Sequence, residues 1–385
     1  MDSTPSSAPG RVSPGSRPVP IPNRRIADRA VDQELVADAV RLGVPQFAFL
    51  PEQDAWAMVV AVSRDDPRLA GMTVFASLGG LTDRSRIEAG ILTPHQGMDT
   101  VLSAVFEVPR TWRGACSLIP FPGDIAVPDG TDAVAMKQFW LAAISRSVLF
   151  NGPEMTGPRG KSSLVKAPDA SCPEAVAPPE RWQREHVCLD YPGAAQATVI
   201  TTAGTGPVLV VFDGNKFLDA HLDHYLAAGC PLPRAMVFIG HGDSVAERNR
   251  DLIDCPDFPG AVARIAGRLS AGDKAMVAGS SYGGVGAVRT TLAHPGVFST
   301  ALAYSPPYAA LADTWPVTRA GKDTVIISRG GSLEWLLTDG FTWGENTLRN
   351  QGVTVIAGRF AGGHDMACWR EDMARDYVAA ASGTL

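Results

Sequence analysis

The sequence contains no long apolar run, no closely spaced cysteine pair and no excess of basic residues. No apolar run approaches the roughly 18 residues that a transmembrane helix needs, so we expect no membrane span. The 34 Lys and Arg residues are outnumbered by 40 Asp and Glu residues, which gives a net charge of −6. This balance argues against nucleic acid as a partner.

The six cysteines are scattered along the chain without a C-x-x-C pair, as expected for reduced thiols in the cytosol. Residues 1–22 are rich in Ser, Pro and Gly, and they lack the basic start and apolar core of a secretory signal. We therefore predict a disordered tail over residues 1–28 and a cytoplasmic location.

The length of 385 residues, of which 45% are hydrophobic, favours two domains. Short alternating segments predict an antiparallel β-sandwich-like domain over 29–150. A Pro- and Gly-rich stretch predicts a linker over 151–184. From 185 to 385 strands alternate with helical stretches, which predicts a mostly parallel sheet.

Within these domains the pattern predicts individual elements. The predicted helices are 30–43, 136–146 and 285–293, and the predicted strands are 56–62, 73–77, 101–108, 207–212, 275–278, 324–328 and 353–358.

The segment Gly279-Ser280-Ser281-Tyr282-Gly283 matches the pattern G-x-S-x-G. It follows the predicted strand 275–278 and precedes the predicted helix 285–293. A strand, a tight turn and a helix are the context of a nucleophile elbow, in which the central serine is held in a strained backbone. We therefore predict Ser281 as a nucleophile. The alternative is an ordinary glycine-rich loop.

A reactive serine needs a base, and His364 is the one histidine near the C-terminus. It follows the predicted strand 353–358 and two glycines. In α/β-hydrolases the histidine lies on a loop after the last strand, and it takes the proton of the serine. We predict His364 as this base. The alternative is a loop histidine bonded to backbone.

Several carboxylates follow the predicted strand 324–328, where the third member of a triad is expected. Glu334 is the first candidate, followed by Asp339 and Glu345. Asp365 adjoins the histidine and ranks lower, because its side chain would have to fold back on its own loop. Each of these residues has the alternative of being a solvated surface carboxylate.

An oxyanion hole needs two N–H groups aimed at one point. We predict that one comes from the backbone of Tyr282, directly after the serine. The other is expected from Gly214 or Asn215, which follow the predicted strand 207–212. The segment Asp213-Gly214-Asn215 also has the composition of a plain turn.

With these residues placed, the chain resembles the enterochelin (enterobactin) esterases, within the esterase-D-like branch of the α/β-hydrolases. The resemblance covers most of residues 45–375. Its most specific stretch is Gly362-Gly363-His364-Asp365 with Cys368-Trp369-Arg370. Further matches lie at 99, 106–112, 117–120, 210–214, 248–252, 278–284 and 294–298. The expected fold is an α/β-hydrolase catalytic domain with a mostly parallel sheet, preceded by a small antiparallel β-sandwich domain.

The resemblance implies hydrolysis of ester bonds in a catecholate siderophore, a cyclic trilactone, and release of iron inside the cell. It assigns Ser281, His364 and Glu334 as the triad, and it implies that Arg248 and Arg250 bind the anionic catecholates. The alternative for the arginines is a salt bridge with Glu247 or Asp251. No cofactor is expected, since iron enters only as part of the substrate. The oligomeric state is left open.

Two departures from the family touch the substrate side. The segment 303–308 lacks tryptophans, and the predicted loop 335–343 is long. A general carboxylesterase, an acyltransferase and a siderophore-binding protein without turnover therefore remain as alternatives. His221 and His224 are three residues apart and fit one helix face. Because we expect no third ligand close to them in sequence, we predict no metal site there.

Overall fold

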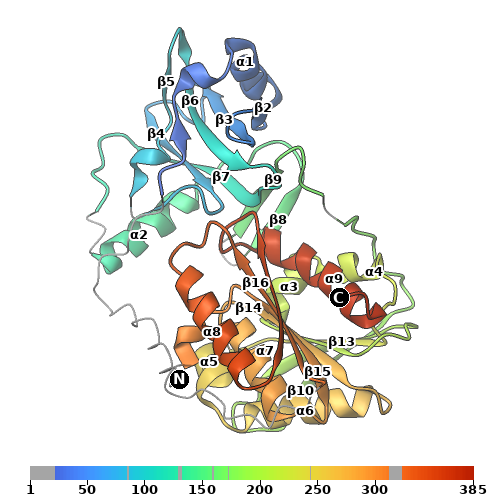
Figure 1. Ribbon diagram of the computed structural model, residues 1–385. Helices are drawn as coiled ribbons and strands as arrows, with labels where there is room; N and C mark the ends of the chain where they lie inside the picture. The colour runs from blue at the N-terminus through green and yellow to red at the C-terminus, as the bar shows by residue number, and fades with distance from the viewer. Residues whose placement is uncertain are drawn as a thin grey trace, which may run out of the picture. The chain divides into compact units, whose positions relative to one another are not determined.

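The computed structural model describes residues 22–84, 86–128, 132–157, 160–171, 173–242, 244–311 and 323–385. Contacts between Cα atoms divide these residues into two compact units. The N-terminal unit contains the described residues up to 171 and also the segment 361–368. The C-terminal unit contains the described residues of 173–360 and 369–385. Figure 1 labels many of the elements of both units.

The N-terminal unit contains two antiparallel sheets. The first has the order β1-β6-β3-β2, with β5 paired to β6. Its strands are β1 (Arg25–Ile26), β2 (Gln46–Leu50), β3 (Ala55–Ser63), β5 (Thr93–His95) and β6 (Met98–Pro109). Helix α1 (Gln33–Leu42) packs on this sheet through Val36 and Ala39. Asp32 caps the start of α1, and Gly43 ends it with a positive φ of 66°, which glycine adopts without strain.

The second sheet of this unit has the order β4-β7-β9-β8. Its strands are β4 (Met72–Leu78), β7 (Arg113–Pro122), β8 (Glu154–Gly157) and β9 (Gly160–Lys166). Helix α2 (Ala133–Ile144) packs on it, and Trp140 contacts Phe75 with ring centroids 5.2 Å apart. Two short 3-10 helices, η1 (Asp28–Ala30) and η2 (Ile87–Ala89), complete the unit.

Two expectations for the N-terminal region were wrong. The stretch 151–184 was predicted as a linker, but Glu154–Gly157 and Gly160–Lys166 pair as the antiparallel strands β8 and β9, and along β9 Ser163 and Val165 are buried while Leu164 is half-buried. Short strands that lie between glycines and prolines cannot be recognised from the amino-acid composition of the segment. Arg25–Ile26 was predicted to lie in a disordered tail, but it pairs with β6 as β1. Residues 1–21 of that tail lie outside the described residues.

The C-terminal unit is built on one eight-stranded sheet with the order β10-β11-β13-β12-β14-β15-β16-β17. The strands β13, β12, β14, β15, β16 and β17 are parallel, and β10 and β11 are antiparallel. The strands are β10 (Gln183–Cys188), β11 (Gln196–Thr201), β12 (Leu209–Phe212), β13 (Ala235–Ile239), β14 (Ala275–Ser280), β15 (Phe298–Tyr304), β16 (Val325–Gly331) and β17 (Thr354–Phe360).

Helices cover both faces of this sheet, so its central strands read as apolar runs. One face carries a core formed with α6 and α7, which includes Val210, Val277 and Val288. On the other face, Tyr304 of β15 donates a hydrogen bond to Asp376 of α9, and α9 runs close to α4 (Figure 1). The helices are α3 (Gly214–Asp219), α4 (Leu222–Ala227), α5 (Val245–Asn249), α6 (Phe258–Leu269), α7 (Tyr282–Ala293), α8 (Thr338–Asn350) and α9 (Met366–Ser382), with η3 (Arg250–Asp254) and η4 (Tyr308–Leu311).

The expected fold class is confirmed: a mostly parallel sheet with helices on both sides follows a small antiparallel β-domain. The predicted loop 335–343 was wrong in its second half, because α8 begins at Thr338. The five cysteines within the described residues are all free thiols. None of the helices described is long and apolar enough to cross a membrane.

Candidate active site

The predicted site residues follow the carboxyl ends of parallel strands, which is where open α/β sheets place their ligands. Gly214 and Asn215 follow β12, Ser281 follows β14, and Glu334 follows β16. His364 follows β17 in the chain. β12, β14 and β15 are neighbours in the sheet.

Ser281 occupies a sharp turn between β14 and α7, with φ 54° and ψ −128°. Its N–H donates to the carbonyl oxygen of Tyr304 at 2.8 Å, and its own carbonyl accepts from Gly284 N–H at 3.0 Å. A Cβ at Gly279 would collide with the carbonyl group of Gly283, so the turn requires glycine at 279. This strained, locally fixed backbone is the geometry of a nucleophile elbow.

The Ser281 side chain itself is left available. The residue is half-buried, and its hydroxyl makes no hydrogen bond among the residues that the structure describes. A strained backbone that presents an unpaired hydroxyl suits a nucleophile better than a structural serine.

The candidate oxyanion donors begin two helices on adjacent strands. Tyr282 is the first residue of α7, and Gly214 and Asn215 are the first two of α3. N–H groups in the first turn of a helix have no partner within the helix. A Cβ built on Gly283 would lie 3.1 Å from Asp213 Oδ2, so the two helix starts are in contact. The structure therefore places the starts of α3 and α7, which carry the candidate donors, next to each other.

Asp213 separates β12 from α3 and is a site residue that the sequence analysis did not assign. It is 5% exposed, and its two carboxylate oxygens accept from Arg248 Nε and Nη2, each at 2.6 Å. Lys216 Nζ donates to it at 2.9 Å. Burial alone would raise the pKa of Asp213, but the hydrogen bonds and charge of Arg248 outweigh burial and hold this pKa below its usual value.

Both predicted substrate arginines carry a carboxylate partner. Arg248 is held by Asp213, and its guanidinium carbon lies 5.8 Å from the ring centroid of Tyr282. Arg250 Nη2 donates at 2.8 Å to Asp251, which is fully buried and also contacts His241. The side chain of Arg250 remains 46% exposed, against 17% for Arg248. The alternative of a salt bridge between Arg250 and Asp251 is confirmed; this pairing leaves the predicted role in binding untested.

The three candidate acids differ sharply in their surroundings. Glu334 is buried; Oε2 accepts from Ser305 Oγ at 2.7 Å and from the N–H of Gly331. Asp339 is exposed in the first turn of α8. Glu345 is buried in an ion pair with Arg359 at 2.9 Å. A network therefore fixes Glu334, whereas Glu345 already neutralises another side chain.

The loop that carries His364 packs with the N-terminal unit. Asp365 fixes it: Oδ2 accepts from Ala115 N–H at 2.6 Å, and Oδ1 accepts from Ala367 N–H at 2.9 Å. A Cβ at Gly363 would lie 2.6 Å from Gly80 Cα, so a glycine is required there too. His364 itself is exposed. Asp365 thus serves as an anchor of the loop, and the histidine side chain projects from a fixed backbone.

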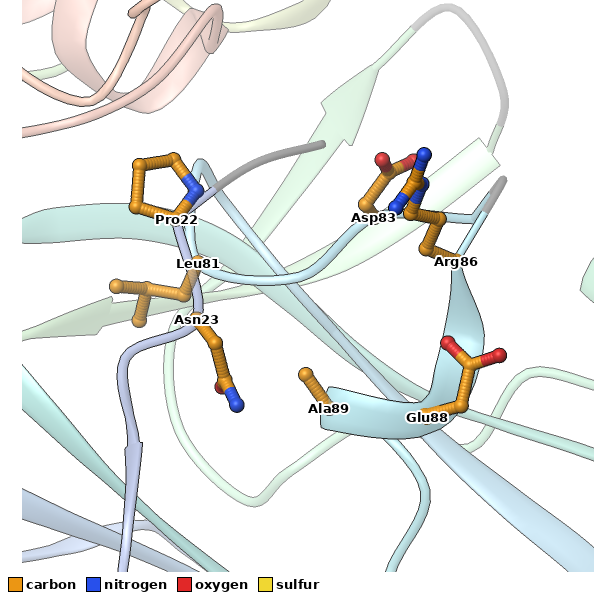
Figure 2. Close-up of a pocket in the computed structure, with 7 residues that line it drawn as sticks. All are labelled: Pro22, Asn23, Leu81, Asp83, Arg86, Glu88 and Ala89. Carbon is orange, nitrogen blue, oxygen red and sulfur yellow. The ribbon is translucent and has the colours of Figure 1, made fainter. Parts of the chain in front are cut away.

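A pocket of about 350 Å³ lies elsewhere, in the N-terminal unit (Figure 2). Its lining residues are Pro22, Asn23, Leu81, Asp83, Arg86, Glu88 and Ala89. None of them was predicted to be functional from the sequence, and none belongs to the strand ends described above.

No protein-family model and no curated protein matches this sequence. Several solved structures are similar to the structure of this protein. The ferric enterobactin esterase from Salmonella typhimurium has a TM-score of 0.69 and 17% identity over 87% of this chain and 95% of its own. The enterobactin esterase from Shigella flexneri, determined in the presence of enterobactin, has a TM-score of 0.66 and 19% identity over 89% of this chain and 96% of its own. At this identity the similarity establishes a shared fold across both units.

Proposed function

We propose that this protein is a serine esterase that hydrolyses the ester bonds of a catecholate trilactone siderophore. The single observation that carries the proposal is the conformation of Ser281, which is strained between strand and helix and whose hydroxyl has no hydrogen-bond partner among the described residues. The shared fold with enterobactin esterases supports the substrate class. We further propose that the reaction takes place in the cytoplasm, where the released iron is used.

In the first step Ser281 Oγ attacks the ester carbonyl carbon, and His364 takes the hydroxyl proton. Glu334 orients the imidazolium that forms. The N–H groups of Tyr282 and of Gly214 or Asn215 donate to the carbonyl oxygen as it becomes negatively charged. The bond to the leaving alcohol breaks, and His364 returns the proton to that alcohol.

In the second step a water molecule attacks the acyl-enzyme. His364 takes a proton from this water as the water oxygen bonds to the acyl carbon. The bond from that carbon to Ser281 Oγ then breaks, and His364 returns the proton to Oγ, which leaves a carboxylic acid and the free serine. Repetition of the cycle on a trilactone opens the ring and then shortens the linear product. Water is the only further reactant in this scheme, and iron enters only with the substrate.

Binding of the catecholates is assigned to Arg248 and Arg250. Both are partly neutralised by carboxylates, so the more exposed Arg250 is the better contact for an anionic ligand. We expect Arg250→Ala to raise KM for the siderophore by about tenfold, the value of one charge-assisted contact. KM for an uncharged p-nitrophenyl ester should not change. An equal rise for both substrates would contradict the assignment.

The decisive test is chromatography of products after incubation with ferric and iron-free trilactone catecholates, with Ser281→Ala as the control. Linear fragments from the wild type alone would support the proposal and show which form is preferred. An intact siderophore, together with cleavage of small esters, would replace it with a general carboxylesterase. No turnover of either substrate would favour a binding protein.

A further inference from the structure

A cluster of side chains lies in the C-terminal unit apart from the strand ends of the candidate site. It consists of His221, Asp223 and His224 at the start of α4 (Figure 1). Among the residues that the structure describes, this is the one group of three such side chains whose ligand atoms all lie within 4.8 Å of one another. The imidazole ring centroids of the two histidines are 4.7 Å apart.

The backbone explains how three residues so close in sequence gather their side chains. His221 precedes α4 with a positive φ of 60°, which only a minority of non-glycine residues adopt. His224 lies in the first turn of α4, and this backbone conformation of His221 leaves the two imidazole rings side by side. We had expected no third ligand close to this pair in sequence. The structure supplies one from Asp223, between the two.

Asp223 provides a second, independent sign of a missing ligand. The residue is 3% exposed, and its buried Oδ1 has no hydrogen-bond partner among the residues that the structure describes. A buried carboxylate oxygen without a partner is costly, and it is the kind of group that a cation satisfies. The other oxygen, Oδ2, accepts from Arg184 Nη2 at 2.7 Å. The side chain of Arg184 is 51% exposed, so it can swing away from Asp223.

We propose that His221, Asp223 and His224 bind a divalent transition-metal ion of the Zn²⁺ class, with the exposed side of the site left to water. Two imidazoles and one carboxylate are a common zinc ligand set, and they disfavour Mg²⁺ and Ca²⁺. Ligand atoms on a tetrahedral zinc ion lie roughly 3.4 Å apart, given bonds of about 2.1 Å. Small side-chain rotations close the present spacing to that value.

The electrostatic surroundings agree with this assignment. Burial lowers the pKa of His224 below its usual value; Asp223 opposes this shift, and His221 and Arg184 add to it. A lowered pKa favours the uncharged imidazole, which is the form that binds metals. The carbonyl of His224 also accepts from the N–H of Val176 at 3.0 Å. A metal ion here would brace the segment that leads into β10, as a structural site.

The test is equilibrium dialysis of the tag-free, chelator-treated full-length protein against Zn²⁺, followed by metal analysis. We expect one equivalent to bind and Mg²⁺ not to compete. His221→Gly, which fits the positive φ, and His224→Ala should each weaken binding by more than about tenfold. His294→Ala, at the far end of α7, is the matched control and should bind as the wild type does.

Arg184→Gln separates a metal site from a merely structural cluster. It removes the competing charge on Asp223 but keeps a hydrogen-bond donor, so Zn²⁺ should bind several-fold more tightly. The rise in Tm on adding Zn²⁺ should follow the same order as the zinc affinities of the variants, because a ligand that binds only the folded state raises Tm. Binding that is unchanged in both histidine variants, or weakened by Arg184→Gln, would overturn the proposal. Zinc binding would then be adventitious.

Discussion

Asp213 and Ser281 occupy equivalent places, since each is the first residue after one of two neighbouring parallel strands and each precedes a helix. Both have φ 54°, but ψ is 35° at Asp213 and −128° at Ser281. The first pair of angles is the left-handed helical region, which aspartate tolerates. The second lies in a region that strains any residue with a Cβ.

Their side chains differ just as clearly. The carboxylate of Asp213 is buried and paired with Arg248 and Lys216. The hydroxyl of Ser281 is half-buried and has no partner among the described residues. Two turns with the same positive φ at neighbouring strand ends therefore differ: Asp213 holds Arg248 and Lys216 through its side chain, whereas Ser281 has the arrangement that the proposed nucleophile requires.

The largest effect should come from Glu334, the proposed acid of the triad. Glu334→Gln keeps the shape of the buried side chain but removes its charge. We expect kcat for ester hydrolysis to fall by about 10³–10⁴-fold, as for other triad acids. Asp339→Asn, on the exposed start of α8, is the control and should leave kcat within about twofold. A large loss in the control, with none in Glu334→Gln, would move the acid to Asp339.

The anchoring role of Asp213 predicts a loss of stability. Asp213→Ala leaves Arg248 without its bidentate partner, and removing one member of a buried ion pair costs about 3–5 kcal/mol. Ser281→Ala should change the free energy of unfolding by less than about 1 kcal/mol. Denaturant unfolding of both variants measures the contrast. Equal losses would mean that Asp213 and Ser281 do not differ as described.

The ion pair between Asp213 and Arg248 also makes the stability of the protein depend on pH. Because the folded pKa of Asp213 lies below its ordinary value of 3.8, its contribution is fully present above that value and is lost as the pH falls through the folded pKa. The stability difference between wild type and Asp213→Ala should be constant from about pH 8 to pH 5 and should shrink below about pH 3.8. A difference that grows on acidification would contradict the ion pair.

The smallest effect tests the strain itself. Ser281→Gly removes the Cβ that makes ψ −128° unfavourable, so it should raise the free energy of unfolding by about 1 kcal/mol relative to Ser281→Ala. Both variants should lack activity. A glycine variant less stable than the alanine variant would indicate that the turn is relaxed in the wild type.

Much of this arrangement could be predicted from the sequence, because it rests on local patterns. The turn at Ser281 follows from glycines at 279 and 283 between an apolar strand and a helix, and α7 confirms the predicted helix, starting three residues earlier at Tyr282. The parallel sheet follows from alternating strands and helices. The β8–β9 hairpin was missed because its short strands lie among glycines and prolines.

Contacts that span the sequence could not be predicted. Asp213 and Arg248 are 35 residues apart, and nothing in either segment names the other as its partner. Asp223 was not predicted as a ligand, because the sequence does not distinguish it from any other aspartate in a helix. Its lack of a partner on Oδ1 is a property of packing alone.

The central claim is that Ser281 is an activated nucleophile, and covalent labelling tests it most directly. The protein is treated with a fluorophosphonate, digested and mapped by mass spectrometry. We predict a single adduct on Ser281, absent in Ser281→Ala and formed much more slowly in His364→Ala. No adduct on the folded wild type, or an adduct on another serine, would contradict it.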